Sequence, residues 1–556
     1  MTACDGLLIA ALGLFLLAWW RPSLPRRTPL LAASALTVLG AGLYGVWDDR
    51  WQAGVGALVG VLCLLGVLLA RRRPAVRRGL PLGSGLLFTL LGALAVAPLW
   101  LFPVSDLPPP DGPHAVGVRD FELVDPSRRG LLGVAADAPR RLLVRVWYPA
   151  APAAGAQPRH YFSDAEAKTT ARGFGALFGF PPLLSHLKHV RSNAFADAPL
   201  PPGIGRLPVV FFSHGYSAYP AADSALMEAL ASHGYAVYSI QHSGDASPTL
   251  LPDGAVVPMD PGLVEHIRHA LRNGFPEPMI RGYTAEDFDE RLDGQLRTAL
   301  EIAPPGNRGI AVSAPVWLAD RLFVHDALQA GAVPASVADL VAASDFARTG
   351  EMGMSFGGST TGAVCLVDAR CAAAVNLDGG DFHFTPFDAD LPVPLLMFHA
   401  DLRGFYRMLG AEPHGALRGF NDFSYERFEH AGQRDDIYRP VMKDSVHAGF
   451  TDNALLVRRP LRDLMAGTAP VEVLIGATNA FVVGFFDRHL RGRDNGFPQA
   501  QYAQYAGWVA PHDTSAVRDW WLAKPAAERA ALQRRIDQMK AALPSAGLQR
   551  LGLKAQ

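Results

Sequence analysis

The N-terminal part of the chain, up to Phe102, consists of long apolar stretches separated by short charged loops. A helix needs about 20 apolar residues to cross ~30 Å of hydrocarbon. Four successive stretches meet or approach this length without a polar face, and tryptophans near their ends suit a membrane interface: Leu7–Trp20, Leu30–Trp47, Val55–Ala70 and Leu80–Phe102. We therefore predict four transmembrane helices within residues 1–104. Buried core helices are the alternative that this pattern disfavours.

The charges of the short loops predict how these helices are oriented. In two alternate loops the only charged residues are arginines, whereas the loop between them carries Asp48, Asp49 and a single Arg50. Positively charged loops stay in the cytoplasm. The N-terminus and everything after Phe102 are therefore expected outside, which in a bacterium means an inner-membrane protein with an extracytoplasmic domain. The loop arginines are Arg21, Arg26, Arg27, Arg71, Arg72, Arg73, Arg77 and Arg78.

Beyond a Pro-rich linker, assigned to residues 105–138, short apolar runs alternate with helical patterns. Such runs predict strands buried on both faces, and their alternation with helices predicts a mostly parallel sheet of the α/β class. We assign this domain to residues 139–495, with residues 250–346 as an insertion or cap. The runs are Arg141–Tyr148, Leu207–Ser213, Ala236–His242, Ala372–Leu377 and Pro394–Phe398.

Residues 496–556 are predicted to form a C-terminal helical tail. Leu532, Ile536, Met539 and Leu543 recur at helical spacing and form one apolar stripe on a charged helix. Packing of this stripe back onto the domain is the main expectation. A membrane surface or a second subunit could also cover it, and the sequence does not indicate an oligomeric state.

Composition and charge exclude some classes of partner. The 556 residues have a formal net charge of −1, which gives no indication of a nucleic-acid partner. The chain has no H-E-x-x-H motif and no glycine-rich phosphate loop, and His266 with His269 fits a solvated helix face. We therefore predict neither a metal nor another cofactor.

The segment Gly353-Met354-Ser355-Phe356-Gly357-Gly358 contains the pattern G-x-S-x-G of a nucleophile elbow. In this motif a serine sits on a tight strand-to-helix turn, and the glycines allow strand and helix to approach each other. A helix-forming stretch of small residues follows, as the motif requires. The preceding residues Arg348–Met352 have a poor composition for a strand. Ser355 is the predicted nucleophile.

A serine nucleophile needs a base and an acid, which follow it in the chain in this type of fold. His447 lies after the strand-like stretch Tyr438–Met442, in a loop suited to the base. Asp378 and Asp401 each end an apolar run, and the residues alone leave both open as the acid. An oxyanion hole needs two backbone N–H groups, for which we predict those of Phe356 and of Tyr216.

Cys365 and Cys371 flank the end of the helix that is expected after Ser355. An extracytoplasmic location permits a disulfide between them. A helix position and a following strand position often diverge, so two separate buried thiols are the expectation.

Several segments together resemble the plasma-type (isoform II) platelet-activating-factor acetylhydrolase family. The resemblance implies an α/β-hydrolase fold and a calcium-independent carboxylic ester hydrolase, like 1-alkyl-2-acetylglycerophosphocholine esterase, that releases short or oxidised acyl chains from phospholipids. It also implies that Asp378, rather than Asp401, is the triad acid. The segments are Arg145–Pro149 (RVWYP), Phe212–Pro220 (FSHGYSAYP), Ala231–His242 (ASHGYAVYSIQH), Gly353–Gly358 (GMSFGG), Asn376–Gly380 (NLDGG) and Asp444–Asp452 (DSVHAGFTD).

These features predict a membrane-anchored serine hydrolase of the α/β-hydrolase fold, with an ester or lipid substrate and the bilayer as partners. The four N-terminal helices, residues 250–346 and the C-terminal helix depart from the family, so the acyl chain and the alcohol stay open. A non-catalytic receptor or scaffold on the same fold is the alternative. A transporter is disfavoured, because the four stretches carry no internal Asp, Glu or Lys.

Overall fold

The computed structural model describes residues 1–72, 81–179, 184–302 and 309–543 and divides the chain into two compact units. The first, here called the membrane unit, comprises Met1–Leu107, His160–Arg191 and Leu455–Arg462. The second, here called the sheet unit, comprises Pro108–Arg159, Ser192–Ala454 and Asp463–Gln556.

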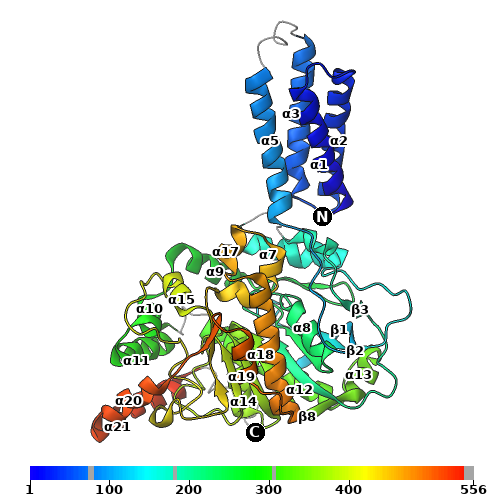
Figure 1. The fold of residues 1–556 in the computed structure, drawn as a ribbon. Helices are drawn as coiled ribbons and strands as arrows, with labels where there is room; N and C mark the ends of the chain where they lie inside the picture. Colours follow the sequence, from blue (N-terminus) through cyan, green and yellow to red (C-terminus); the bar gives the residue numbers. More distant parts are fainter. Residues whose placement is uncertain (73–80, 180–183, 303–308, 544–556) are drawn as a thin grey trace. The chain divides into compact units, whose positions relative to one another are not determined.

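Four apolar helices form the bundle of the membrane unit (Figure 1). All four are long and apolar enough to cross a membrane. Glycines allow close packing, because a Cβ added at Gly42 would overlap the backbone of Ala57 in the neighbouring helix. Leu80, Arg73, Arg77 and Arg78 lie outside the described residues. The helices are α1 (Ala3–Trp20), α2 (Arg27–Trp47), α3 (Ala53–Arg72) and α5 (Pro81–Leu101).

The connection between α2 and α3 binds the segment His160–Arg191 within the membrane unit. Lys188 forms an ion pair of 2.8 Å with Asp48, Arg172 pairs with Asp49, and the Ser185 hydroxyl donates to the Asp49 carbonyl. This segment therefore packs at the end of the bundle where α2 ends. Its short helices are α6 (Asp164–Glu166), η1 (Ala167–Ala171), α7 (Arg172–Leu177) and η2 (Ser185–His189).

The sheet unit is built on nine strands in the order β11-β10-β9-β8-β4-β5-β2-β1-β3. The strands from β11 to β5 are parallel, whereas β2 runs antiparallel to β5 and β1. This confirms the predicted mostly parallel sheet. The strands are β1 (Ala115–Arg129), β2 (Pro139–Ala150), β3 (Ala194–Ala196), β4 (Leu207–Ser213), β5 (Ala236–Gln241), β8 (Ser344–Met354), β9 (Cys371–Leu377), β10 (Leu395–Phe398) and β11 (Ile437–Tyr438).

Helices cover both faces of the sheet. Alternate residues of its central strands point to opposite sides, and both sets are apolar, so each face needs a cover. On β4, Val210 and Phe212 pack in one apolar cluster with α8 (Ser224–Ser232) and α18 (Val471–Arg491). Val209 and Phe211 pack in another cluster with α12 (Ala314–Gln329) and α13 (Ala338–Ala343). Figure 1 shows α8 and α18 on the same side of the sheet.

Two strands depart from what composition alone suggests. The strand β8 includes Arg348–Met352 and lies between β9 and β4, where the sheet and its flanking helices override the weak local preference. The strand β1 lies within residues 105–138, which were expected to be a linker. Its charged positions disguise it in the sequence, but they are paired; Asp120, for example, binds Arg145 of β2 at 2.6 Å.

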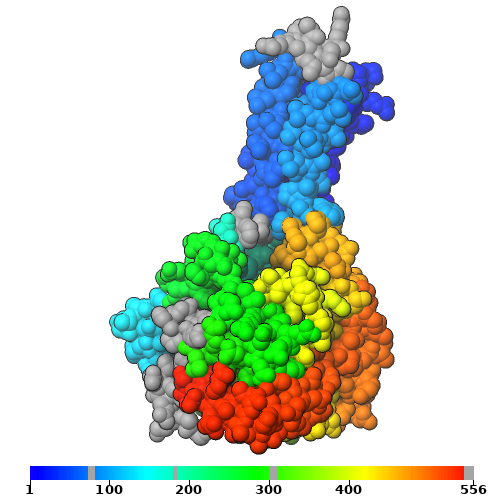
Figure 2. All heavy atoms as spheres, turned by 90° about the vertical axis from the view of Figure 1, so that its left-hand side faces the viewer, coloured from blue at the N-terminus to red at the C-terminus, as the bar shows by residue number. Residues whose placement is uncertain are grey.

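The described residues of the segment 250–346 and of the C-terminal region up to residue 543 are mostly helical. Ile536, Met539 and Leu543 of the predicted stripe are buried in a cluster with Phe288 and Phe387, so the stripe packs onto the sheet unit. Figure 2 shows the C-terminal helices in red against the green residues of this segment. The remaining elements include α9 (Pro261–Asn273), α10 (Glu277–Thr284), α11 (Phe288–Arg297), α15 (Leu402–Met408), β12 (Pro440–Met442), α17 (Leu461–Met465), α19 (Gln499–Gln504), β13 (Val509–Pro511), α20 (Ser515–Ala523) and α21 (Ala526–Ala542).

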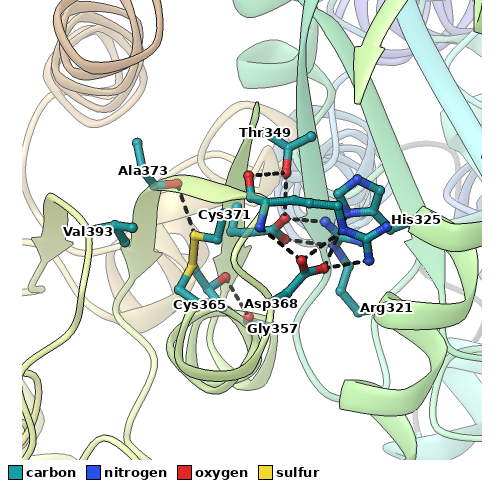
Figure 3. The surroundings of a disulfide bond; sticks show 12 residues. Arg321, His325, Thr349, Gly357, Cys365, Asp368, Cys371, Ala373 and Val393 are labelled. Atoms are coloured by element: carbon teal, nitrogen blue, oxygen red, sulfur yellow. Dashed lines mark hydrogen bonds and ion pairs between the residues drawn. A yellow bond between two sulfur atoms is a disulfide. The ribbon is translucent and has the colours of Figure 1, made fainter. Parts of the chain in front are cut away.

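Cys365 and Cys371 form a disulfide, so the expectation of two separate thiols is wrong. The chain reverses at Asp368 and β9 begins at Cys371, which brings the two Cα atoms to 5.2 Å. Figure 3 shows the disulfide beside the ion pairs of Asp368. It joins the end of the helix α14 (Phe356–Val367) to the start of β9.

Candidate active site

Ser355 lies on the tight turn between β8 and α14, with φ 55° and ψ −120°. The left-handed φ is strained for a residue with a Cβ. The flanking glycines permit it, because a Cβ at Gly353 would overlap the backbone of Gly357, and one at Gly357 would overlap the carbonyl of Ser213. The turn therefore has the geometry that the G-x-S-x-G pattern predicts.

The structure brings Ser355, His447 and Asp378 together in one hydrogen-bonded chain, here called the elbow array. His447 Nε2 lies 2.8 Å from Ser355 Oγ, and His447 Nδ1 lies 2.7 Å from Asp378 Oδ2. In the arrangement that satisfies all three groups, Nδ1–H donates to the carboxylate and the serine hydroxyl donates to Nε2. The Asp378 side chain is only 2% exposed, whereas that of His447 is 38% exposed.

Asp378 is held by the backbone on both sides of its position. It follows β9 with φ 55°, its N–H donates to the Phe398 carbonyl, and its Oδ1 accepts the N–H of Ala400 at 2.7 Å. These bonds fix one carboxylate oxygen and aim the other at the imidazole. A fixed acid keeps the histidine in one orientation and one tautomer.

Asp401, the other candidate acid, has a different role. Its two carboxylate oxygens accept the N–H groups of Arg403 and Asp444, each at 2.9 Å, and it caps α15. Because both oxygens are engaged with backbone amides, Asp401 ties the start of α15 to the loop that leads to His447. Of the two candidates that the residues alone left open, Asp378 therefore lies beside His447 and Asp401 lies against backbone amides.

Asn376 supports the turn after β9 and was missed in the sequence. Its side chain accepts the N–H of Gly379 at 2.7 Å and donates to the carbonyl of the same residue at 3.0 Å. A Cβ at Gly379 would overlap the carbonyl of Ser355. The asparagine and the glycine therefore let the Asp378 turn pass close under the nucleophile. An Asn three residues before a Gly pair was the available signal.

The two predicted oxyanion residues flank Ser355. Phe356 is the first residue of α14, so its N–H has no acceptor within the helix. Tyr216 lies in the loop after β4, where a Cβ at Gly215 would be 3.4 Å from Ser355 Cβ. The rings of Tyr216 and Phe356 pack at 5.1 Å, and Phe382 stacks on Phe356 at 5.6 Å. The three rings form one cluster around the residue that follows Ser355, here called the aromatic wall.

His214, which precedes Gly215, shapes this loop. Burial and the neighbouring His242 lower the pKa of His214 to about 3, so the ring is neutral at physiological pH. Nδ1–H donates to the Gly215 carbonyl at 2.7 Å, and Nε2 accepts the N–H of His242 at 3.2 Å. The ring is fully occupied by these bonds. Among the described residues, no group of three or more His, Cys, Asp or Glu side chains could hold a metal ion.

A mostly parallel sheet covered by helices, with a serine on a strained strand-to-helix turn followed in the chain by its Asp and His neighbours, defines the α/β-hydrolase fold. The family model for platelet-activating factor acetylhydrolase, isoform II, matches residues 101–251. This range holds the Tyr216 loop and ends before Ser355. The match confirms the resemblance that the sequence segments predicted.

A solved structure of ferulic acid esterase from Streptomyces cinnamoneus is similar to the chain, with 23% identity and a TM-score of 0.48. The similarity covers 74% of this chain and 100% of that chain. No curated protein sequence matches the chain significantly.

Proposed function

We propose that the chain is a membrane-anchored serine hydrolase that cleaves carboxylic esters through an acyl-enzyme. The observation that carries this proposal is the elbow array, in which two hydrogen bonds of 2.7 and 2.8 Å link Asp378, His447 and Ser355. A half-exposed imidazole in contact with a strained serine is the arrangement that nucleophilic catalysis requires.

In the proposed mechanism the Ser355 hydroxyl attacks the ester carbonyl while His447 Nε2 accepts its proton. Asp378 stabilises the resulting imidazolium, and the N–H groups of Tyr216 and Phe356 bind the negative oxygen of the tetrahedral intermediate. His447 then gives the proton to the leaving alcohol. A water molecule, deprotonated by the same histidine, attacks the acyl-enzyme and releases the acid.

The substrate class that we propose is phospholipid with a short or oxidised acyl chain. The family match supports this class. The aromatic wall of Tyr216, Phe356 and Phe382 also supports it, because such rings provide apolar surface beside the nucleophile. Anchoring in a bilayer keeps the enzyme where such substrates are concentrated.

We propose further that residues after α5 lie outside the cytoplasm, in a bacterial inner membrane. Arg172 and Lys188, which follow α5 in the chain, bind Asp49 and Asp48 at one end of the bundle. The connection with Arg21, Arg26 and Arg27 lies at the opposite end, because α1 and α2 are consecutive antiparallel helices. The positive-inside rule places that arginine end in the cytoplasm.

The decisive test uses the detergent-solubilised full chain, p-nitrophenyl acetate and a fluorophosphonate probe. The wild type should hydrolyse the ester and be labelled, and Ser355→Ala should abolish both while the circular dichroism spectrum is retained. A wild type that is neither active nor labelled would favour the non-catalytic receptor instead. A panel of phospholipids with short, oxidised and long acyl chains then tests the substrate class, for which the first two should react fastest.

A further inference from the structure

A second Ser–His–Asp arrangement, here called the buried array, lies in the interior of the sheet unit. His242 Nε2 is 3.1 Å from Ser213 Oγ, and His242 Nδ1 is 3.0 Å from Asp320 Oδ2. All three side chains are almost fully buried, with residue exposures of 3% or less. Because no substrate can reach Ser213 there, the buried array is not a second nucleophile.

Charge explains how the buried array is held. Arg128 of β1 and Arg140 of β2 both bind Asp320, at 2.7 and 2.6 Å. Burial raises the cost of ionising Asp320, but the charges of Arg140 and Arg128 outweigh it and hold the pKa of this carboxyl below its usual range. Burial lowers the pKa of His242 despite its bond to Asp320. A neutral His242 therefore donates a hydrogen bond from Nδ1–H to Asp320, and its Nε2 accepts a hydrogen bond from the Ser213 hydroxyl.

The buried array leads directly to the predicted oxyanion loop. Ser213 is the last residue of β4, and His214, Gly215 and Tyr216 follow it. Its carbonyl also lies against Gly357, in the first turn of α14 after Phe356. The position of Ser213 thus sets the start of the loop that carries one proposed oxyanion donor and borders the helix that carries the other.

Three residues, Ser313 just before α12 and Trp317 and Asp320 within it, support this loop directly or through one other residue. The Ser313 hydroxyl lies 3.0 Å from the Tyr216 hydroxyl. Trp317 Nε1–H donates to Asp245, whose carbonyl accepts the N–H of Ser217. Asp320 acts through His242 on Ser213. The spacing of four and three residues places the three side chains on one face of the helix.

Trp317 also packs against both proposed oxyanion residues. Its ring stacks on His242 at 3.9 Å and meets the rings of Phe356 and Tyr216 at 4.9 and 6.3 Å. It is fully buried. A rigid ring at this place couples the Tyr216 loop to the start of α14.

We propose that Ser313, Trp317 and Asp320 are positioning residues that hold the Tyr216 loop at the distance from Ser355 that oxyanion binding needs. Asp320 acts through the buried array, whereas Ser313 and Trp317 act through their own contacts with the loop. This inference rests on the proposed function. It assigns part of the segment 250–346 to the catalytic framework, so that segment is not a removable cap. Preorganised donors of this kind contribute only when charge develops on the carbonyl oxygen.

The test uses Ser213→Ala and Ser313→Ala in the full chain, because each removes one hydroxyl and leaves the buried ion pairs intact. Ser232→Ala is the control, since Ser232 is also buried and its hydroxyl takes part in two hydrogen bonds away from the loop, so its loss perturbs the fold at least as much. Each test variant should lower kcat for p-nitrophenyl acetate about tenfold, less than the loss of an entire oxyanion donor, and change KM less than about twofold.

The affinity for a trifluoromethyl ketone, whose adduct with Ser355 carries a negative oxygen, should fall by the same factor as kcat. A general loosening of the fold would instead change the control variant and KM as well. If the wild type is active but both test variants keep its kcat and its inhibitor affinity, the positioning role is refuted and the proposed function still stands. A wild type without esterase activity or labelling would overturn the proposed function together with it.

Discussion

The elbow array and the buried array share one hydrogen-bond pattern and differ in everything around it. In both, an imidazole links a carboxylate at Nδ1 to a serine hydroxyl at Nε2, over 2.7 to 3.1 Å. His447 is 38% exposed, whereas His242 is fully buried. Ser355 sits on a strained turn, whereas Ser213 ends a regular strand.

The acids differ in the same sense. Asp378 has a backbone amide and one imidazole as partners, so in the proposed mechanism none of the described arginines competes for its charge when His447 becomes positive. Asp320 is already neutralised by Arg128 and Arg140. We propose that the same three residue types serve proton transfer in one place and fix a loop in the other. Access and charge balance, rather than the hydrogen-bond pattern, distinguish the two roles.

The largest effect that would sharpen the comparison is expected at Asp378. Asp378→Asn should lower kcat by on the order of 10⁴-fold, because an amide no longer selects the required imidazole tautomer. Asp401→Asn is the comparison variant and should lose far less activity than Asp378→Asn, since the Asp401 carboxylate accepts backbone N–H groups and not an imidazole N–H. Ester hydrolysis by the two variants checks this. Equal losses in both, or a larger loss at Asp401, would contradict the assignment of the acid.

The second effect concerns stability rather than rate. Asp320→Ala leaves two buried arginines without their shared carboxylate and should lower the free energy of unfolding by about 3–5 kcal/mol. Asp326→Ala on the same helix is the control, because Asp326 is 65% exposed and its pair with Arg370 contributes at most about 1 kcal/mol. Chemical unfolding in detergent, followed by near-ultraviolet circular dichroism, measures both. Similar unfolding free energies of the two variants would show that the buried ion pairs of Asp320 contribute no more to stability than the exposed pair of Asp326.

Sequence reasoning located the elbow array better than the buried array for a physical reason. The elbow depends on glycines at fixed offsets and on a strand-to-helix turn, which are local and visible in Gly353–Gly357. His447 was predicted because the fold orders the base after the nucleophile, whereas Asp378 was preferred to Asp401 only because of the family resemblance. Asp320 is separated from His242 by 78 residues, and only tertiary packing brings it there. No local pattern marks it.

The same distinction explains the errors elsewhere. The apolar runs predicted β4, β5 and β9 closely, since continuous burial leaves a clear signal. The strand β1 was assigned to a linker because paired charges interrupt its apolar pattern. The disulfide was missed because it depends on how sharply the chain reverses between Cys365 and Cys371. The secondary-structure preferences of single residues indicate neither the paired charges of β1 nor the tight reversal before Cys371.

The smallest effect lies in how pH acts on the imidazoles of the interior. The folded pKa of His214 is about 3, whereas an unfolded histidine titrates near its ordinary 6.5. Below pH 6.5 this histidine is therefore protonated in the unfolded chain but not in the folded chain. The free energy of unfolding consequently decreases as pH falls from 6.5 toward 3. This histidine alone should contribute about 2 kcal/mol of loss between pH 6.5 and 5.

His214→Asn keeps a donor for the Gly215 carbonyl and removes the titration, so its unfolding free energy should depend less steeply on pH than that of the wild type. The slope, measured between pH 7 and 5 in the same detergent, separates this effect from any constant loss of stability caused by the substitution. Parallel curves for variant and wild type would mean that the interior admits a charged His214. The ring would then not hold the loop as a neutral acceptor for the His242 N–H, and the contrast between buried imidazoles that fix a loop and the half-exposed His447 would fail at His214.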